Sequence, residues 1–497
     1  VSLFALLALG ACSGGGGMDG TATNPTPMPP QPMGQATVGV LLTDAPGSTF
    51  SEANATITSI ALMGGGAPQA IFSGSNTIDL FKLDSSSDLF ALSSTVAPGS
   101  FNKIRLTLSD LELVRRDNAG NVVERVHPHL PGNGKIDLNL RDSMNAASGD
   151  TLLLELDFDM QKSIQIVTTG SGRVNFRPVI FVRLLQKSLN GRLARVAGTV
   201  GTIDAMAQTF DLCDLVRNVP AMTSTTRSSS GDDHMGDHCV AVAFDDQTSV
   251  FGADGAPLTF ADLKEGDQVT AIGRISKDEQ GEDNSGMGGS SGGDQGDHHD
   301  LRLDAVVVEV GPPGTFARVK GSIKTAVDAA TQRFDLGVDA GQGFAPDTVL
   351  STLLQDGTRI FDRKGTELAT DAIVVDLAAR VDGVLALSST EADTLKSSLI
   401  VIDTEAPNTE TVLHGDVLTL DAASSSLTMT TDAGDRCVHV KDDTAIFLIT
   451  VTDADFSSER GMFADLVAGN HLDVFGTENA DGCVDAAAVI AEVTAAP

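Results

Sequence analysis

Histidine and aspartate residues gather in two Gly/Ser-rich insertions that interrupt the segment 193–311. The insertions hold Asp232, Asp233, His234, Asp237, His238, Asp297, His298, His299 and Asp300. Imidazole together with carboxylate is a ligand set for zinc, nickel, copper or manganese, and carboxylates alone suit calcium. If the surrounding strands run up and down, both insertions leave the same end of a barrel. One hypothesis is therefore that the chain binds a divalent metal ion there.

The same insertions are also typical of solvated, low-complexity loops. Gly, Ser and Asp with scattered His usually form exposed inserts that have no packed core. His234 and His238 are four residues apart, but the neighbouring glycines disfavour the helix that would align them. No stretch follows the twelve-residue calcium loop with its Gly at position six. We favour this second interpretation, so no cofactor is expected apart from the alternative of a divalent metal.

The remaining candidate groups favour a structural role over catalysis. The sequence has no Gly-x-Ser-x-Gly elbow, phosphate loop, His-Glu-x-x-His motif or dinucleotide fingerprint. Asp157 and Asp159 flank Phe158 on one predicted strand; such a pair could serve a glycosidase but is more typical of a solvated face. Asp44 is expected to cap its own turn. We predict no catalytic residue and no enzyme, and an envelope hydrolase without a recognisable motif is the remaining alternative.

Four cysteines are distributed as expected for two disulfides. Cys213 and Cys239 lie in the segment 193–311, Cys437 and Cys483 lie in 411–495, and the segment between them has none. Four cysteines allow three pairings, and this segregation favours one bridge within each segment. Free thiols and metal thiolates are the alternatives. Metal thiolates are disfavoured because the sequence has no CxxC pair and no closely spaced Cys/His quartet.

The fifth cysteine, Cys12, follows a short apolar leader. Val1–Leu9 is shorter than the roughly 20 residues that span a bilayer, and it indicates the apolar region of a truncated signal peptide at 1–11. Leu9-Gly10-Ala11-Cys12 resembles the bacterial lipobox, whose Cys carries a diacylglycerol after cleavage. Several acyl chains anchor stably, since each buried methylene contributes about 0.8 kcal/mol. An ordinary signal peptide with an accidental Cys is the alternative.

The residues around this cysteine predict where the chain is held. A Gly/Pro-rich tether occupies 12–35 and would separate the folded part from the membrane. Ser13, in place of the Asp that would indicate retention in the inner membrane, favours the outer membrane of a Gram-negative bacterium. The folded part would face the periplasm or the cell surface.

The composition excludes several classes of partner. The chain of 497 residues carries 67 Asp+Glu against 33 Lys+Arg, a net charge of −34, and its aromatic residues are all Phe. This acidity disfavours nucleic-acid binding and basic-patch contact with anionic lipid. The absence of Trp and Tyr weakens the case for a carbohydrate-stacking cleft. The expected partners are the bilayer, through the acylated N-terminus, and an unknown protein or surface.

Residues 36–187 alternate between apolar and polar with the period of strands. Val38, Val40 and Leu42 alternate, as do the apolar residues of 152–158, and turn-forming segments separate about eight such runs. This pattern predicts an antiparallel β-sandwich, with a short helix near Ser87–Leu92. The segments Val38–Pro46, Leu153–Lys162 and Phe176–Val179 resemble domain of unknown function 4382. That resemblance implies a bacterial lipoprotein module and brings no known catalytic residues.

Beyond residue 193 one pattern occurs three times. Arg195-Val-Ala-Gly, Arg318-Val-Lys-Gly and Val412-Leu-His-Gly align, and Phe260–Gly266 is nearly the same as Phe463–Gly469. A strand with Gly273 or Gly476 follows these two segments, whereas the middle copy lacks the Phe-Ala-Asp-Leu segment and aligns weakly through Ala378–Gly383.

The three units span 193–311, 316–404 and 411–495, and each resembles domain of unknown function 5666, the middle one in a degenerate form. The resemblance implies a small all-β module often found in exported bacterial proteins. Short strands with Gly at sharp bends predict small β-barrels, which we expect to be joined as independent beads. The sequence therefore predicts an all-β, non-catalytic lipoprotein of the cell envelope that acts as a binding or structural module.

Overall fold

The structure, a computed structural model, is built almost entirely from β-strands. It describes residues 34–44, 50–117, 120–166, 174–185, 192–216, 239–277, 301–340, 342–387, 393–404, 410–451 and 456–493. In this part of the chain α-helix is limited to one turn, α1 (Met160–Ser163), and none of the helices is long and apolar enough to cross a lipid bilayer. The predicted all-β class is confirmed.

Strands β1 to β11 make up the N-terminal region, a sandwich with a separate two-stranded sheet of β9 and β10. They are β1 (Ala36–Asp44), β2 (Glu52–Gly64), β3 (Gln69–Asp79), β4 (Ser87–Val96), β5 (Gly99–Arg116), β6 (Val122–Val126), β7 (Lys135–Ala146), β8 (Thr151–Phe158), β9 (Ile164–Ile166), β10 (Val174–Phe176) and β11 (Ile180–Leu185). One sheet has the order β11-β8-β1-β4 and the other β7-β5-β2-β3. Val40 and Leu154 of the first sheet and Ile104 of the second belong to one shared core.

The sandwich is mixed rather than purely antiparallel. Strand β1 runs antiparallel to β4 but parallel to β8, from the pair Thr37 and Thr151 to the pair Asp44 and Phe158. The carboxyl ends of β1 and β8 therefore lie side by side, which brings Asp44 close to the residues that follow Phe158.

The helical turn of this region lies earlier than predicted. A 3-10 helix, η1 (Leu80–Leu83), begins after Asp79, whose carboxylate accepts the N–H of Phe81 at 3.3 Å. The short helix expected near Ser87–Leu92 is wrong, because these residues belong to strand β4. Their side chains are buried on both faces of the sheet, and such a run lacks the alternation that separates a strand from a helix.

Three barrels follow the sandwich. The first has β12 (Ala194–Asp204), β13 (Thr209–Val216), β14 (Val240–Ala243), β15 (Ser249–Phe251), β16 (Pro257–Leu258), β17 (Gln268–Lys277) and β18 (Leu301–Val310). The second has β19 (Ala317–Ile323), β20 (Arg333–Val338), β21 (Val349–Asp362), β22 (Ala378–Ala386) and β23 (Thr394–Ile402). The third has β24 (Thr411–Asp421), β25 (Ser426–Thr431), β26 (Gly434–Val451), β27 (Phe456–Arg460), β28 (His471–Glu478) and β29 (Val484–Glu492).

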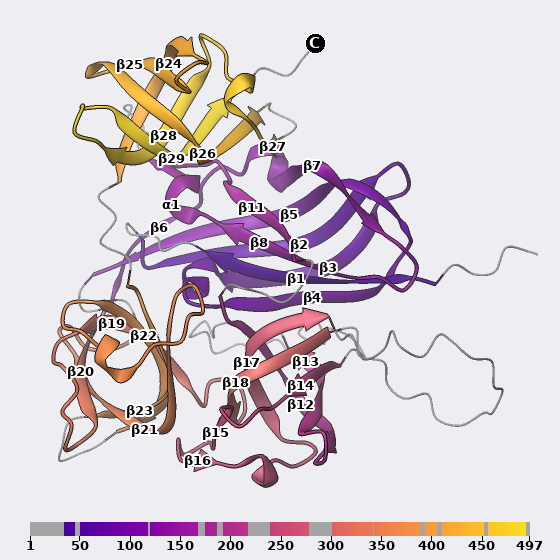
Figure 1. Cartoon of the computed structure of the whole chain (residues 1–497), viewed down its shortest axis with the longest axis vertical. Helices are drawn as coiled ribbons and strands as arrows, with labels where there is room; N and C mark the ends of the chain where they lie inside the picture. The colour runs from indigo at the N-terminus through magenta and orange to yellow at the C-terminus, as the bar shows by residue number, and fades with distance from the viewer. Residues whose placement is uncertain are drawn as a thin grey trace, which may run out of the picture. The chain divides into compact units, whose positions relative to one another are not determined.

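All three barrels close through the same ring of strand pairs. The second, orange in Figure 1, has the order β19-β20-β21-β23-β22, with β22 paired back to β19. The corresponding rings are β12-β13-β14-β18-β17 in the first barrel and β24-β25-β26-β29-β28 in the third. Closure pairs every strand of the ring on both sides, which removes exposed sheet edges.

The second barrel keeps features that its sequence obscures. The Phe-Ala-Asp-Leu segments form the 3-10 helices η3 (Phe260–Asp262) and η6 (Phe463–Asp465), and η5 (Thr370–Ala372) lies at the same place in the second barrel. The register of pairing shifts at Gly273 in β17, at Gly383 in β22 and at Gly476 in β28. A Cβ on Gly383 would lie 2.1 Å from the carbonyl oxygen of Lys396, so only glycine fits this close approach of two strands.

The barrels are not independent beads, and that expectation is wrong. Strand β12 pairs with β4 and β27 pairs with β7, so both sheets of the sandwich continue into a barrel. Leu41 packs in the core of the first barrel, and Phe447 of the third packs in the core of the sandwich. Runs such as Val306–Val308 and Leu399–Ile402 are buried on both faces. A neighbouring unit must cover the outer face of these strands.

We predict that Gly383→Ala destabilises the protein by about 1–3 kcal/mol, because the new methyl group must displace backbone rather than a flexible side chain. Denaturant-induced unfolding measures the effect. Gly65→Ala is the matched control, since no atom lies within 4 Å of its added Cβ, and it should change the free energy of unfolding by less than about 0.5 kcal/mol. Equal effects of the two substitutions would contradict the close approach at Gly383.

Candidate functional site: a buried charged junction

The proposed metal-binding residues and the proposed lipidation site lie outside the described residues. These are Cys12 and the insertion residues Asp232, Asp233, His234, Asp237, His238, Asp297, His298, His299 and Asp300. Their roles stay predictions.

The other four cysteines form two disulfides. Cys213 is bonded to Cys239 and Cys437 to Cys483, so each bridge lies within one barrel, as their segregation in the sequence predicted. The first bridge connects β13 to the residue before β14, and the second connects β26 to the residue before β29.

Asp44, from the family-like opening segment, lies fully buried at the end of β1. Its Oδ1 accepts the N–H of Met160, the first residue of α1, at 3.1 Å. The turn that Asp44 was expected to cap, 45–49, lies outside the described residues. Its Oδ2 has no hydrogen-bond partner in the described part of the chain. Burial raises the pKa of Asp44 well above its ordinary value; the hydrogen bond from Met160 opposes this shift, and nearby Asp159 and Asp157 add to it.

Asp157 and Asp159 do not form the solvated face that the sequence predicted. Only 15% of the Asp157 side chain is exposed, and Arg183 lies 3.6 Å from it. Asp159 accepts the N–H of Lys162 at 3.0 Å and pairs with its ammonium at 2.8 Å. Burial raises the pKa of Asp157, against the opposing effect of Arg192 and Arg183. Each carboxylate has a cation beside it, an arrangement typical of a structural ion pair rather than of a glycosidase acid.

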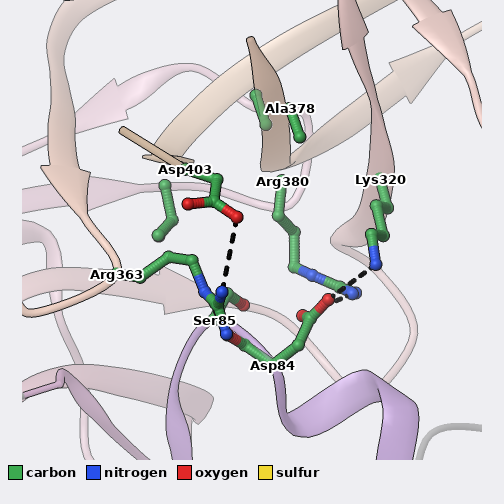
Figure 2. A pocket seen from close by; sticks show the side chains of 9 residues that line it. Asp84, Ser85, Lys320, Arg363, Ala378, Arg380 and Asp403 are labelled. Carbon is green, nitrogen blue, oxygen red and sulfur yellow. Dashed lines mark hydrogen bonds and ion pairs between the residues drawn. The ribbon is translucent and has the colours of Figure 1, made fainter. Parts of the chain in front are cut away.

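A cluster of buried charges lies where the connection between η1 and β4 meets the first two barrels. Asp84 pairs with Arg380 at 2.6 Å and with Lys320 at 3.0 Å, as Figure 2 shows. Arg363 donates to the backbone oxygen of Asp84 at 3.1 Å and to Asp403 at 3.3 Å. Burial alone would raise the pKa of Asp84, but Arg380 and Lys320 outweigh it and hold this pKa at about 2.

Two arginines from the repeated motif extend the cluster. Arg195 of β12 forms an ion pair with Asp382 of β22 and donates to Ser86 Oγ at 3.2 Å. Arg318 of β19 also donates to Ser86 Oγ, at 3.1 Å, and lies 3.7 Å from Asp382 and 3.8 Å from Asp88. Burial and the neighbouring Arg195 lower the pKa of Arg318 to about 9. Three separate units thus share one set of charges.

We call these ten charged residues the charged junction. Its cations are Arg195, Arg318, Lys320, Arg363 and Arg380, and its carboxylates are Asp84, Asp88, Glu309, Asp382 and Asp403. Five positive charges balance five negative ones, so the cluster can be buried without leaving an isolated charge. The hydroxyl of Ser86, at its centre, faces guanidinium groups rather than a base. Because an activated serine requires a base beside it, this geometry supports ion pairing and not nucleophilic catalysis.

A small pocket opens beside Asp84 (Figure 2). It is lined by Asp84, Ser85, Lys320, Arg363, Ala378, Ala379, Arg380, Val401 and Asp403. Its three cations would attract an anion, but Lys320 and Arg380 already pair with Asp84, and Arg363 with Asp403. An anionic ligand would therefore have to displace one of these carboxylates.

A second group of charges joins the sandwich to the third barrel. Arg177 pairs with Asp473 of β28 at 2.9 Å and with Glu492 of β29 at 2.8 Å. Lys162 lies 3.6 Å from Glu410, the residue before β24. Arg177 and Lys162 both come from segments that carry the family resemblance, which gives those segments a structural role in this chain.

The sequence contained one signal of the charged junction that our interpretation missed. Arg195 and Arg318 begin the repeated motif in the first two copies, whereas the third copy has Val412. An arginine at the same position of two copies, next to a buried Val, indicates a cation close to the barrel core. Only the structure identifies the carboxylates that receive these arginines, because they come from segments distant in sequence.

We predict that Asp84→Asn destabilises the folded protein by about 3–5 kcal/mol, because it leaves Arg380 and Lys320 without their carboxylate in a buried site. Since the pKa of Asp84 is lowered in the folded protein, the ionised carboxylate contributes its full stabilisation above pH 3.8. This contribution to the free energy of unfolding is lost as the pH falls to about 2. Denaturant unfolding at several pH values measures both effects. Asp304→Asn, which breaks the exposed pair with Arg302, is the control and should cost no more than about 1 kcal/mol.

Asp44→Asn should behave in the opposite way. The amide keeps an oxygen for the N–H of Met160 and removes a buried charge, so the variant should be at least as stable as the parent at pH 7. Because the pKa of Asp44 is raised, the parent gains stability as the pH falls from 7 towards 4, and the variant should lose part of this gain. Thermal unfolding between pH 7 and pH 4 measures how the stability of each protein changes with pH. A steeper pH dependence in the variant than in the parent would contradict the prediction.

Residues 35–178 match the family described as domain of unknown function (DUF4382), a match that covers most of the sandwich and less than a third of the chain. No curated protein and no solved structure matched the chain. The family match supports the resemblance of the N-terminal sandwich to DUF4382.

Proposed function

We propose that this protein is a non-catalytic, lipid-anchored structural module of the cell envelope, which binds an as yet unknown protein or surface. The observation that carries the proposal is the charged junction. Its buried cations, which a catalytic or ligand site would direct at a substrate, are paired with carboxylates of other units of the same chain. Charges used in this way hold the sandwich and the barrels together.

Two features support a location in the cell envelope. Leu9-Gly10-Ala11-Cys12 provides the sequence at which a lipoprotein is cleaved and acylated. The two disulfides are typical of proteins in oxidising compartments such as the periplasm. The resemblance of the barrels to domain of unknown function 5666, found in exported bacterial proteins, agrees with this location.

The charge distribution supports a binding partner other than nucleic acid. The chain carries 34 more acidic than basic groups, and the charged junction is neutral. The excess negative charge therefore lies outside the junction, where it keeps the protein soluble and repels polyanions. A protein or mineral surface with positive charge is a better match for it than nucleic acid.

We predict that the chain incorporates labelled palmitate when it is expressed in a Gram-negative host with an initiating Met and a basic n-region supplied ahead of Val1. Cys12→Ala should abolish the label, because no other residue of the motif can form the thioether. The double variant Cys213→Ala/Cys239→Ala is the matched control and should keep the label. Gel fluorography of membrane fractions gives the readout. An unlabelled chain, or one recovered from the cytosol, would contradict the proposed anchor and location.

A further inference from the structure

Four side chains with metal-binding chemistry meet on the outer face of the third barrel. Strands β26 and β29 run parallel, with Val438 opposite Val484 and His439 opposite Asp485. Side chains alternate along a strand, so Cys437 and His439 point to the same face of β26. The buried Val438 and Val484 point to the core. Cys483 and Asp485 therefore share the outer face with Cys437 and His439.

Three potential ligand atoms lie close together in this group while its two sulfurs are still bonded to each other. One ligand atom from each of Cys437, His439 and Cys483 lies within 4.8 Å of the other two, and all three residues are partly exposed. His439 Nδ1 lies 3.2 Å from Asp485 Oδ1, and Asn479 donates to the same oxygen at 3.0 Å. A carboxylate held against an imidazole nitrogen orients the ring, as it does for zinc-bound histidines.

We propose that reduction of the Cys437–Cys483 disulfide creates a binding site for a thiophilic divalent cation of the zinc type. A dithiol reductant transfers two electrons and two protons to the disulfide, which gives two thiols and the oxidised, cyclic form of the reductant. The cation then binds both sulfurs as thiolates together with the His439 imidazole, and two protons are released. Asp485 positions His439. The ammonium of Lys441 lies 2.6 Å from the second carboxylate oxygen of Asp485 and keeps that carboxylate outside the ligand set.

The ligand chemistry selects the class of metal. Two thiolates and one imidazole form a soft set of S and N donors, which suits Zn²⁺ and disfavours Ca²⁺ and Mg²⁺. Three protein ligands leave one tetrahedral position for water or an external group. The sequence interpretation disfavoured metal thiolates because the chain has no CxxC pair and no closely spaced Cys/His quartet; Cys437 and Cys483 are separated by 46 residues. The parallel pairing of β26 with β29 removes that objection, because it places them side by side.

The first barrel contains a natural comparison for this site. Cys239 and Cys437 occupy equivalent positions in Cys-Val-x-Val segments, but the residue two positions later is Ala241 in one and His439 in the other. The Cys213–Cys239 bridge therefore provides two thiols on reduction but has no imidazole at the position of His439. The proposal predicts that only one of the two reduced pairs binds the cation with three ligands.

Cobalt titration of the full chain tests the proposal, since Co²⁺ replaces Zn²⁺ in thiolate sites and gives a sulfur-to-metal charge-transfer band. All proteins carry Cys12→Ser, so that the N-terminal thiol contributes no ligand. After reduction with a dithiol and removal of the reductant, we expect one equivalent of Co²⁺ to produce the band and Zn²⁺ to displace it. The oxidised protein should not give the band, and metal bound by the Asp/His insertions would leave it unchanged because those insertions contain no cysteine and so no thiolate ligand.

Three variants identify the ligands. Cys437→Ser/Cys483→Ser should abolish the band, Cys213→Ser/Cys239→Ser should retain it, and His439→Ala should weaken Co²⁺ binding at least tenfold. Far-ultraviolet circular dichroism follows the fold of each reduced protein. The proposal is overturned if the reduced protein gives no band, if it unfolds on reduction, or if the band survives loss of Cys437 and Cys483. Unchanged affinity in His439→Ala would also overturn it.

Discussion

The structure depends on the neutralisation of charges that are buried between units. Asp84, Asp382 and the arginines that reach them lie in a region with little access to water, where an unpaired charge is far more costly than at the surface. Each unit of the fold supplies only part of the set: the sandwich provides Asp84 and Asp88, and the barrels provide the cations. A buried ion pair adds little stability compared with a well-packed apolar contact. Loss of one partner is more costly, because it leaves the other charge buried and unpaired.

Apolar residues, like the charges, are buried between units. Closed barrels have no free sheet edges, yet their outer faces carry apolar residues that only a neighbour can cover. Val307 and Leu399 belong to a small core shared by the first and second barrels, and Phe475 of the third barrel packs in the core of the sandwich. The pairing of β12 with β4 and of β27 with β7 adds backbone hydrogen bonds across two of these boundaries. The charged junction thus lies within an apolar assembly that supplies most of the stability.

The three barrels share a glycine in the strand that closes the ring and differ at several positions that face outwards. The glycine at the register shift is retained in all of them, at Gly273, Gly383 and Gly476, because the partner strand leaves no room for a side chain. At outward positions the copies diverge: Arg195 and Arg318 correspond to Val412, and His439 corresponds to Ala241. The same barrel topology therefore presents different side chains: an arginine that forms ion pairs in two barrels, and a cluster of sulfur and imidazole groups in the third.

The all-β class, the threefold repeat and the segregation of cysteines could be predicted from the sequence alone, because these depend on local alternation, local spacing and composition. The family-like segments also located the sandwich. The partners of Asp44, Asp84 and Arg195, the parallel pairing of β1 with β8 and the junction between units could not be predicted from the sequence. Those depend on which distant segments become neighbours, and alternation of apolar residues carries no information on that. Consecutive apolar residues, as in Leu399–Ile402, were the one local sign that both faces of a strand are covered. The segments that cover these faces are known only from the assembled fold, because burial of the second face and neutralisation of the charges within it are properties of the assembled units.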